Sequence, residues 1–316
     1  MDKSEMRQKI LDFSEQLNTE LPVENLARWT RKDKFIVCGM GGSSLAAGLL
    51  KVYQPGLDLL IHRDYGLPRV PRYFLEESML IISSYSGEVE EVIDTFGLAR
   101  KRGLDLAVIT SGGTLLELAQ AAGVPHIILP SGWPPRLAVG WSLVAMATLV
   151  GDERLVSRLK ELIEFFQPAA LEPTGQELAS LLKGKLPLVY ASTVNLPLAY
   201  NWKINLNETG KTAAFYNVLP EANHNELEAS DERFFYLLLR DDTDHARIKR
   251  RFDCLIEMFK RRNIAHKEIF LTGDPVEKIF SSVLLAIWTA FHLALSSDSD
   301  PLGVPIIEEF KKQLIN

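Results

Sequence analysis

Cysteine is scarce in this chain of 316 residues, which contains only Cys38 and Cys254. Two thiols so far apart in sequence give no disulfide framework of the kind that holds small secreted domains together. Cys38 lies inside the apolar run FIVCGM, where a buried thiol is the expected state. The chain is therefore expected to fold around hydrophobic cores, and its thiols favour a reducing compartment.

The chain also lacks a positive net charge and a long apolar run. Its 35 Lys and Arg against 41 Asp and Glu give a formal net charge of -6, so nothing attracts it at long range to nucleic acid or anionic lipid. The N-terminal MDKSEMRQKILDFSEQL has no apolar signal-peptide core, and LAVGWSLVAMATLVG falls short of the roughly 18 residues of a membrane helix. The sequence predicts a cytoplasmic protein with neither nucleic-acid nor membrane partner, in which any basic site is local.

From residue 35 onward, short β-rich runs alternate with longer helical patterns. The first five candidate strands are FIVCGM, LDLLIHR, MLIISSY, DLAVITS and HIILP. In the stretch EVEEVIDTFGLARKRG, Val89, Val92 and Phe96 recur at near-helical spacing, and Gly103 suits the end of a helix. Such alternation predicts an α/β fold with a doubly wound parallel sheet.

The length predicts two domains, at about 150 residues each. A second, shorter series of strands follows, PLVYAS, FFYLLLR and KEIFLT, with helices near residues 195–207, 243–261 and 275–297. Between the two series, QPAALEPTGQE carries two prolines and a glycine, a composition typical of a linker. We therefore expect an N-terminal lobe over 1–166, a linker over 167–177 and a C-terminal lobe over 178–316.

Two loops rich in glycine and serine follow first-lobe strands directly. GMGGSS contains Gly42 and Ser43, and SSYSGEVEE contains Ser84 and Ser86. At the carboxyl edge of a parallel sheet, such loops let backbone N–H groups and hydroxyls surround a phosphate at a helix N-terminus. Either loop alone fits ordinary turn and N-cap residues equally well, but two converging loops favour a phosphate site.

A nicotinamide site is the competing interpretation of the first loop. Gly39 and Gly41 match the start of the G-x-G-x-x-G pattern, and Asp64 follows about 20 residues later. The third glycine position is occupied by Ser44, which disfavours dinucleotide binding.

Two basic residues are further candidates. Arg136, in SGWPPRLAVGWS, precedes an apolar helix, where a cation opposes the helix dipole, so it either faces an anionic ligand or lies on the surface at a helix rim. Lys311 lies in VPIIEEFKKQL, four residues after Ile307 and three before Leu314, which places it on the inward stripe of a helix. It could meet a substrate oxygen there, or extend to solvent as many lysines do.

The segment LNETGKTAAFYNVLPEANHNELEAS, residues 206–230, has no clear helical or strand period. It contains Glu208 and, within NHNE, His224. Taken alone it fits a polar connector with a solvated carboxylate and a surface imidazole.

In combination, these motifs resemble those of the sugar isomerase (SIS) proteins, and among them the bifunctional phosphoglucose/phosphomannose isomerases. The resemblance covers most of the chain through GMGGSS, SSYSGEVEE, PPRLAVGWS, NLNETGKTAAFYNVLPEANHNELEA and DPLGVPIIEEFKKQL, in the order and approximate spacing of the family. It implies two flavodoxin-like SIS lobes and the reversible isomerisation of glucose 6-phosphate and fructose 6-phosphate, with mannose 6-phosphate as a further substrate.

The resemblance also assigns roles to individual residues. Glu208 takes the position of the carboxylate base, and His224 that of a ring-opening histidine, which in family dimers reaches the site of the neighbouring subunit. Lys311 corresponds to a lysine near the ring oxygen, and Arg136 to an arginine that stabilises the enediolate. The phosphate-binding positions are Gly42, Ser43, Ser84, Ser86 and Val89. No metal or other cofactor is implied, and the sequence has no H-E-x-x-H spacing of the kind that zinc sites use.

Three positions depart from the family pattern. One is Glu88, which stands in place of an asparagine and adds negative charge beside the expected phosphate site. Val89 replaces a threonine whose hydroxyl contacts phosphate, which removes a hydrogen bond to a charged group worth about 1.5–3 kcal/mol. Trp141 stands where a tyrosine is usual. Two other functions stay open: a noncatalytic sugar-phosphate sensor, which needs the phosphate loops but not the base, and an aldosamine 6-phosphate isomerase or deaminase.

Overall fold

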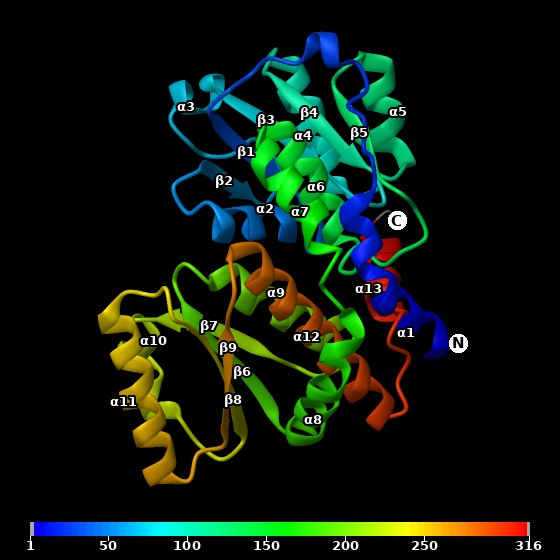
Figure 1. The fold of residues 1–316 in the computed structure, drawn as a ribbon. Helices are drawn as coiled ribbons and strands as arrows, with labels where there is room; N and C mark the ends of the chain where they lie inside the picture. Colours follow the sequence, from blue (N-terminus) through cyan, green and yellow to red (C-terminus); the bar gives the residue numbers. More distant parts are fainter. Residues whose placement is uncertain (1–2, 315–316) are drawn as a thin grey trace. The chain divides into compact units, whose positions relative to one another are not determined.

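The structure, a computed structural model, describes residues 3–314 and divides into two compact α/β units (Figure 1). One unit comprises Asp12–Phe166, and the other comprises the chain up to Leu11 together with everything from Gln167 onward. The first helix, α1 (Lys3–Leu11), thus belongs to the C-terminal unit, whereas the sequence places it in the N-terminal lobe. Arg7 of α1 donates two hydrogen bonds of 2.9 and 2.7 Å to the carboxylate of Glu172 in that unit.

The segment expected as a linker, 167–177, is instead helical. It forms the 3-10 turn η3 (Pro168–Leu171) and the start of α8 (Glu172–Leu182), each with a proline in its first turn. Proline is well tolerated there because the first helical N–H groups have no partner in the helix. Gly175 lets α8 approach α12 (Pro275–Ser296), since a Cβ at this position would lie 2.5 Å from the Cβ of Trp288.

The N-terminal unit is built on a five-stranded parallel sheet of order β2-β1-β3-β4-β5. All five strands coincide with the runs that the sequence marks, although β1 and β3 each begin one residue earlier: β1 (Lys34–Cys38), β2 (Asp58–His62), β3 (Ser78–Ser83), β4 (Leu106–Thr110) and β5 (His126–Ile128). The chain passes from β1 outward to β2 and then back across β1 to β3. The loop after β1 and the loop after β3 therefore lead to helices on opposite faces of the sheet, which confirms the doubly wound fold.

Helices cover both faces of this sheet. On one face, α3 (Arg72–Glu77), α4 (Glu90–Lys101) and α5 (Gly113–Ala122) enclose a core that includes Ile36, Leu80, Phe96 and Val108. On the other, α2 (Gly42–Tyr53) packs against α6 (Val139–Val150), which α7 (Glu153–Leu162) and η1 (Asp12–Asn18) join. Another 3-10 turn, η2 (Leu26–Arg28), precedes β1.

The C-terminal unit repeats the pattern with a parallel sheet of order β7-β6-β8-β9. Its strands are β6 (Leu186–Ser192), β7 (Phe215–Leu219), β8 (Phe234–Asp241) and β9 (His266–Leu271). The sequence patterns reveal β6, β8 and β9 but miss β7. This edge strand, FYNVL, has a strand-like composition, but it is short, only Leu219 is fully buried, and it lies inside a segment without a clear period, so the pattern hides it.

The two faces of the second sheet are covered differently (Figure 1). α11 (Ala246–Arg262) and the short α10 (Ala222–Asn225) enclose a core with Tyr190, Tyr236 and Phe259, while α8, α9 (Leu196–Glu208) and α12 pack together on the other face. The short η4 (Leu227–Ala229) follows α10, and α13 (Pro305–Leu314) ends the described chain.

α12 is long and apolar enough, by length and composition, to cross a membrane, contrary to the expectation that no run of the sequence reaches that length. Within this chain, however, 78% of its most apolar window is buried. Trp288 at its centre donates a 2.8 Å hydrogen bond to the carbonyl of Pro168. It thus has the burial of a core helix.

Candidate functional site

The two glycine- and serine-rich loops of the N-terminal unit converge. β1 and β3 are neighbours in register, with Cys38 opposite Ile82, so both loops leave the same edge of the sheet. The hydroxyl of Ser43 accepts a 2.9 Å hydrogen bond from the Tyr85 N–H, and the Ser83 hydroxyl donates at 3.2 Å to the Ser43 carbonyl. Ser43 therefore ties the first loop to the second at the N-terminus of α2.

A third loop lies against the first. A Cβ added to Gly42 would lie 2.8 Å from the backbone nitrogen of Arg136 and 2.8 Å from the carbonyl carbon of Pro135. Arg136 itself is 2% exposed, so its interpretation as a surface guanidinium on a helix rim is wrong. A cation just before α6 opposes the dipole of that helix, so local helix stability does not explain its position.

We expect Gly42→Ala to lower kcat and raise KM together, because the new methyl group displaces the backbone that carries Arg136. Gly97→Ala is the matched control, since a Cβ at Gly97, inside α4, meets nothing within 4 Å. That change should leave the kinetics unaltered and raise the melting temperature, because alanine favours the helix by about 1 kcal/mol over glycine. Equal kinetic effects of the two changes would contradict the role of the close approach.

The second loop holds its serines in tight turns. The buried Ser84 hydroxyl accepts the Gly87 N–H at 3.1 Å, and the exposed Ser86 hydroxyl accepts the Glu88 N–H at 3.3 Å. The Glu88 carboxylate accepts from the N–H and hydroxyl of Thr114, at 2.8 and 2.9 Å, in the first turn of α5. A carboxylate there is favoured by the helix dipole, so the negative charge of Glu88 is compensated locally.

Val89 is the N-cap residue of α4 and makes no side-chain cap. Its side chain is half-buried against the core that α4, α5 and the sheet enclose. The hydroxyl that the family pattern leads us to expect here is therefore replaced by an apolar contact.

Glu208 is the last residue of α9 and is half-buried. A carboxylate at a helix C-terminus opposes the helix dipole, so local stability does not explain it. The ammonium group of Lys211, which follows in NETGK, donates to the backbone carbonyls of Glu208 and Gly303 at 2.5 Å each. Lys211 thereby joins the end of α9 to the segment before α13; its position in the motif gives no hint of this.

His224 lies on α10 and is exposed, and within residues 3–314 its ring makes no hydrogen bond. Glu226, two residues later, attaches this strip to the sheet by accepting a 2.6 Å hydrogen bond from the Tyr190 hydroxyl of β6 and another from the Asn217 side chain of β7. Burial, and then the contact with Glu226, raises the pKa of Tyr190. The His224 imidazole is thus exposed on a short segment that Glu226 anchors to β6 and β7.

Lys311 is not on a buried stripe, so that expectation is wrong. Every described residue of α13 is exposed, including Ile307 at 40% and Leu314 at 55%. The apolar period of this helix is present, but no described residue of the C-terminal unit covers it. The sequence thus indicates the helix and its two faces but not what the apolar face contacts.

A buried ion pair lies at the carboxyl edge of the second sheet, where β6 and β8 end. The Lys278 ammonium lies 3.0 and 2.9 Å from the two carboxylate oxygens of Asp241, and the Asn195 amide donates to Asp241 at 3.1 Å. Burial acts to raise the pKa of Asp241, but hydrogen bonds from Thr243 and Lys278 outweigh it and lower this pKa. Sequence patterns point to neither partner, since they lie 37 residues apart.

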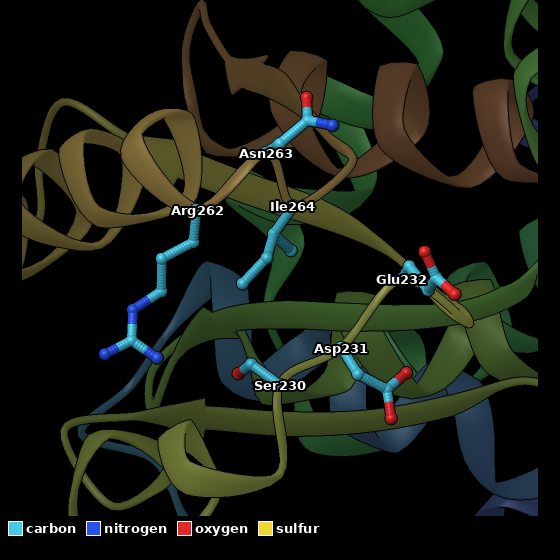
Figure 2. A pocket seen from close by; sticks show the side chains of 6 residues that line it. All are labelled: Ser230, Asp231, Glu232, Arg262, Asn263 and Ile264. Carbon is cyan, nitrogen blue, oxygen red and sulfur yellow. The ribbon is translucent and has the colours of Figure 1, made fainter.

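A cavity of about 440 Å³ lies at the opposite, amino-terminal edge of the second sheet (Figure 2). It is lined by the segments that precede β8 and β9, and the side chains of Asp231 and Arg262 point apart within it. Asp231 pairs with Arg233 instead, at 2.5 Å. None of the candidate catalytic residues lines this cavity.

Comparison with known proteins identifies the family. A family model described as the bacterial phospho-glucose isomerase C-terminal SIS domain matches residues 172–314. The bifunctional phosphoglucose/phosphomannose isomerase of Aquifex aeolicus is 32% identical over 310 residues, which cover 92% of this chain and 93% of that protein. The chain belongs to the bifunctional phosphoglucose/phosphomannose isomerase family. Its relative of the same name in Caldicellulosiruptor bescii is 29% identical, over 98% of this chain and 96% of that protein.

Proteins with other activities are also similar to this chain. The D-glucosamine-6-phosphate 4-epimerase of Sulfolobus acidocaldarius is 32% identical over 62% of this chain and 63% of its own. Among solved structures, the C-terminal domain of glucosamine-fructose-6-phosphate aminotransferase from Francisella tularensis has a TM-score of 0.69 at 14% identity, over 96% of this chain and 100% of that one. This likeness confirms the two-lobe SIS fold.

Proposed function

We propose that this protein interconverts glucose 6-phosphate and fructose 6-phosphate and also accepts mannose 6-phosphate. The observation that carries the proposal is that isomerases of this dual name match it over more than nine-tenths of both chains. The converging loops around Ser43 and the buried Arg136 beside them suit a phosphorylated, anion-forming substrate. The proposal further includes that it needs no metal or other cofactor and works in the cytoplasm.

In the proposed mechanism, the sugar ring opens first, with His224 and Lys311 as the groups that move protons to and from the ring oxygen and the anomeric hydroxyl. Glu208 then removes the proton from one of the carbons C1 and C2 and returns it to the other. The Arg136 guanidinium stabilises the negative charge of the enediolate without itself titrating. Ser43, Ser84, Ser86 and the N–H groups at the start of α2 hold the phosphate.

The proposed proton transfer between C1 and C2 is tested by running the reaction on fructose 6-phosphate in deuterium oxide. The glucose 6-phosphate product is followed by proton NMR. Proton transfer through a carboxylate that exchanges with solvent predicts deuterium at C2. A product formed without any isotope at C2 under prolonged turnover would favour a hydride shift and contradict the role of Glu208.

Val89→Thr is expected to lower KM for the phosphorylated sugar, because the threonine hydroxyl can donate to the phosphate and also cap α4. A hydrogen bond to a charged group is worth about 1.5–3 kcal/mol, so the decrease should be at least about tenfold. Val89→Ala is the control, since it shortens the side chain without adding a donor. A threonine variant with the KM of the wild type would mean that another donor already serves the phosphate.

The proposal includes a homodimer in which His224 acts in the site of the neighbouring subunit. Support comes from the exposed, unpartnered imidazole of His224 among the described residues and from the exposed apolar face of α13, where Ile306 is 81% and Phe310 60% exposed. Large apolar side chains in such an arrangement are commonly covered by a partner chain.

Mixing two inactive variants tests this arrangement. Glu208→Gln and His224→Ala subunits, unfolded and refolded together, should form mixed dimers in which one site is built from two intact groups. Half of the dimers in an equal mixture are mixed and each has one such site, so about a quarter of the wild-type activity should return. If no activity returns although mixed dimers form, each site uses its own His224.

An aldosamine 6-phosphate isomerase or deaminase is the second candidate, and the likeness to the Sulfolobus epimerase is the observation that favours it. Ammonia release from glucosamine 6-phosphate would reveal a deaminase. A noncatalytic sensor would bind fructose 6-phosphate, seen as a higher melting temperature, without turning it over.

A further inference from the structure

A second concentration of basic side chains lies in the C-terminal unit, on the side of the sheet that α11 covers. A cavity of about 380 Å³ is formed between α11 and the segment of α10 and η4. Three arginines of α11 line it, Arg247, Arg250 and Arg251, which stand at positions i, i+3 and i+4 and so share one helix face. All residues that line the cavity belong to the C-terminal unit, whereas the proposed phosphate loops belong to the other.

The three arginines are not explained by the stability of the chain. Within residues 3–314, none of their side chains makes an ion pair or a hydrogen bond. Like charges at these spacings repel each other, and cations near a helix N-terminus oppose its dipole. The first turn of α11 carries no acidic residue to offset them. The cluster is thus a local concentration of positive charge without a paired carboxylate among the described residues, in a chain of net charge -6.

The rest of the cavity is complementary to a small organic molecule. Leu227, Leu255 and Met258 supply an apolar wall, which packs on the core of the unit. On the α10 side, the Oδ1 atom of Asn223 is buried and accepts no hydrogen bond from the described residues. Because this oxygen is closed to solvent, it supports no ligand contact by itself, but Asn223 lines the cavity and a side-chain amide can hydrogen-bond a ligand hydroxyl.

We propose that this cavity binds a small phosphomonoester that carries a free hydroxyl, at a site separate from that of the sugar-phosphate substrate. Arginine guanidinium groups bind phosphate oxygens in a bidentate manner, the N-terminal end of α11 adds a favourable field, and Asn223 takes the hydroxyl. The volume is at the lower end of the range for small-ligand sites, which suits a short polyol phosphate.

Cys254 makes the site directly measurable. Its thiol is exposed and lines the cavity, whereas Cys38 is 1% exposed, and burial raises the pKa of Cys38 to about 12. Alkylation of the full-length protein by iodoacetamide, an uncharged reagent, should therefore report on Cys254 alone. The rate is measured at increasing glycerol 3-phosphate, with potassium chloride of equal ionic strength as the reference.

The expected result is that Cys254 loses most of its reactivity along a saturable, single-site curve, and that Arg247→Gln/Arg251→Gln abolishes this protection. Lys260→Gln/Arg261→Gln removes the same charge from the other end of α11 and should retain it. Three results would overturn the proposal: protection no greater than that by potassium chloride, protection that survives in the Arg247/Arg251 variant, or a loss of reactivity that depends on protein concentration alone, as when a second copy covers the cavity. The thiol readout needs no isomerase activity, so it stands or falls apart from the proposed function.

Discussion

Glu208→Gln is expected to lower kcat by about 10²–10⁴-fold with little change in KM, because it removes the proposed base and keeps the size and hydrogen-bonding capacity of the side chain. Glu208 ends α9 as a half-buried carboxylate, and glutamine keeps its size at this helix end, so the variant should still fold. The measurement is steady-state kinetics on fructose 6-phosphate together with a thermal melt.

Glu228→Gln is the matched control for this change. Glu228 is exposed, lies in the same 206–230 segment, and undergoes the same chemical substitution. Its kinetics should equal those of the wild type. A Glu208 variant that retains most of the wild-type kcat would assign the base to another residue.

Lys278→Met is expected to destabilise the protein by about 3–5 kcal/mol, the largest stability effect that we anticipate, because it leaves the Asp241 carboxylate buried without its cation. Both partners are nearly inaccessible, with side chains 6% and 4% exposed. Urea denaturation of the variant measures the loss. Asp241→Asn/Lys278→Met, which removes both charges, should recover much of it.

The exposed pair of Lys267 and Glu177 is the matched control. Its N–O distance of 2.8 Å is similar, but the side chains are 41% and 57% exposed, so Lys267→Met should cost less than about 1 kcal/mol. If the two lysine variants lose equal stability, the buried pair contributes no more than a surface contact.

The same ion pair has a defined pH dependence. The pKa of Asp241 is lower in the folded chain than its ordinary value, so the stabilisation it gives is present above the unfolded pKa of about 3.9 and is lost as the pH falls through the folded value. The difference between wild type and Lys278→Met should therefore be full at neutral pH and shrink in acid.

The sequence predicts the fold well where local pattern decides it. Short apolar runs mark every strand of the first sheet, because buried parallel strands are apolar on both faces. The prediction fails where contacts with residues far away in the sequence determine the secondary structure. β7 is a short, partly exposed edge strand, and the expected linker is a helix whose proline and glycine serve its first turn and its packing on α12.

The candidate site likewise contains features that local sequence patterns predict and features that depend on long-range contacts. The strand-helix alternation places the Ser43 and Ser84 loops at the same edge of a parallel sheet, and they converge because β1 and β3 are neighbours in it. The roles of Lys211 and Glu226 depend on contacts with Gly303 and with Tyr190 and Asn217, which no spacing rule gives. The stripe of α13 was found, but its burial was wrongly assigned because a period does not say what covers it.

The most direct test of the isomerase account is a coupled assay of the purified chain on fructose 6-phosphate, in EDTA and without added metal, with separate detection of glucose 6-phosphate and mannose 6-phosphate. The account predicts sustained formation of both products. If fructose 6-phosphate raises the melting temperature yet neither product forms with or without added divalent metal, the protein is a sugar-phosphate sensor and the account is contradicted.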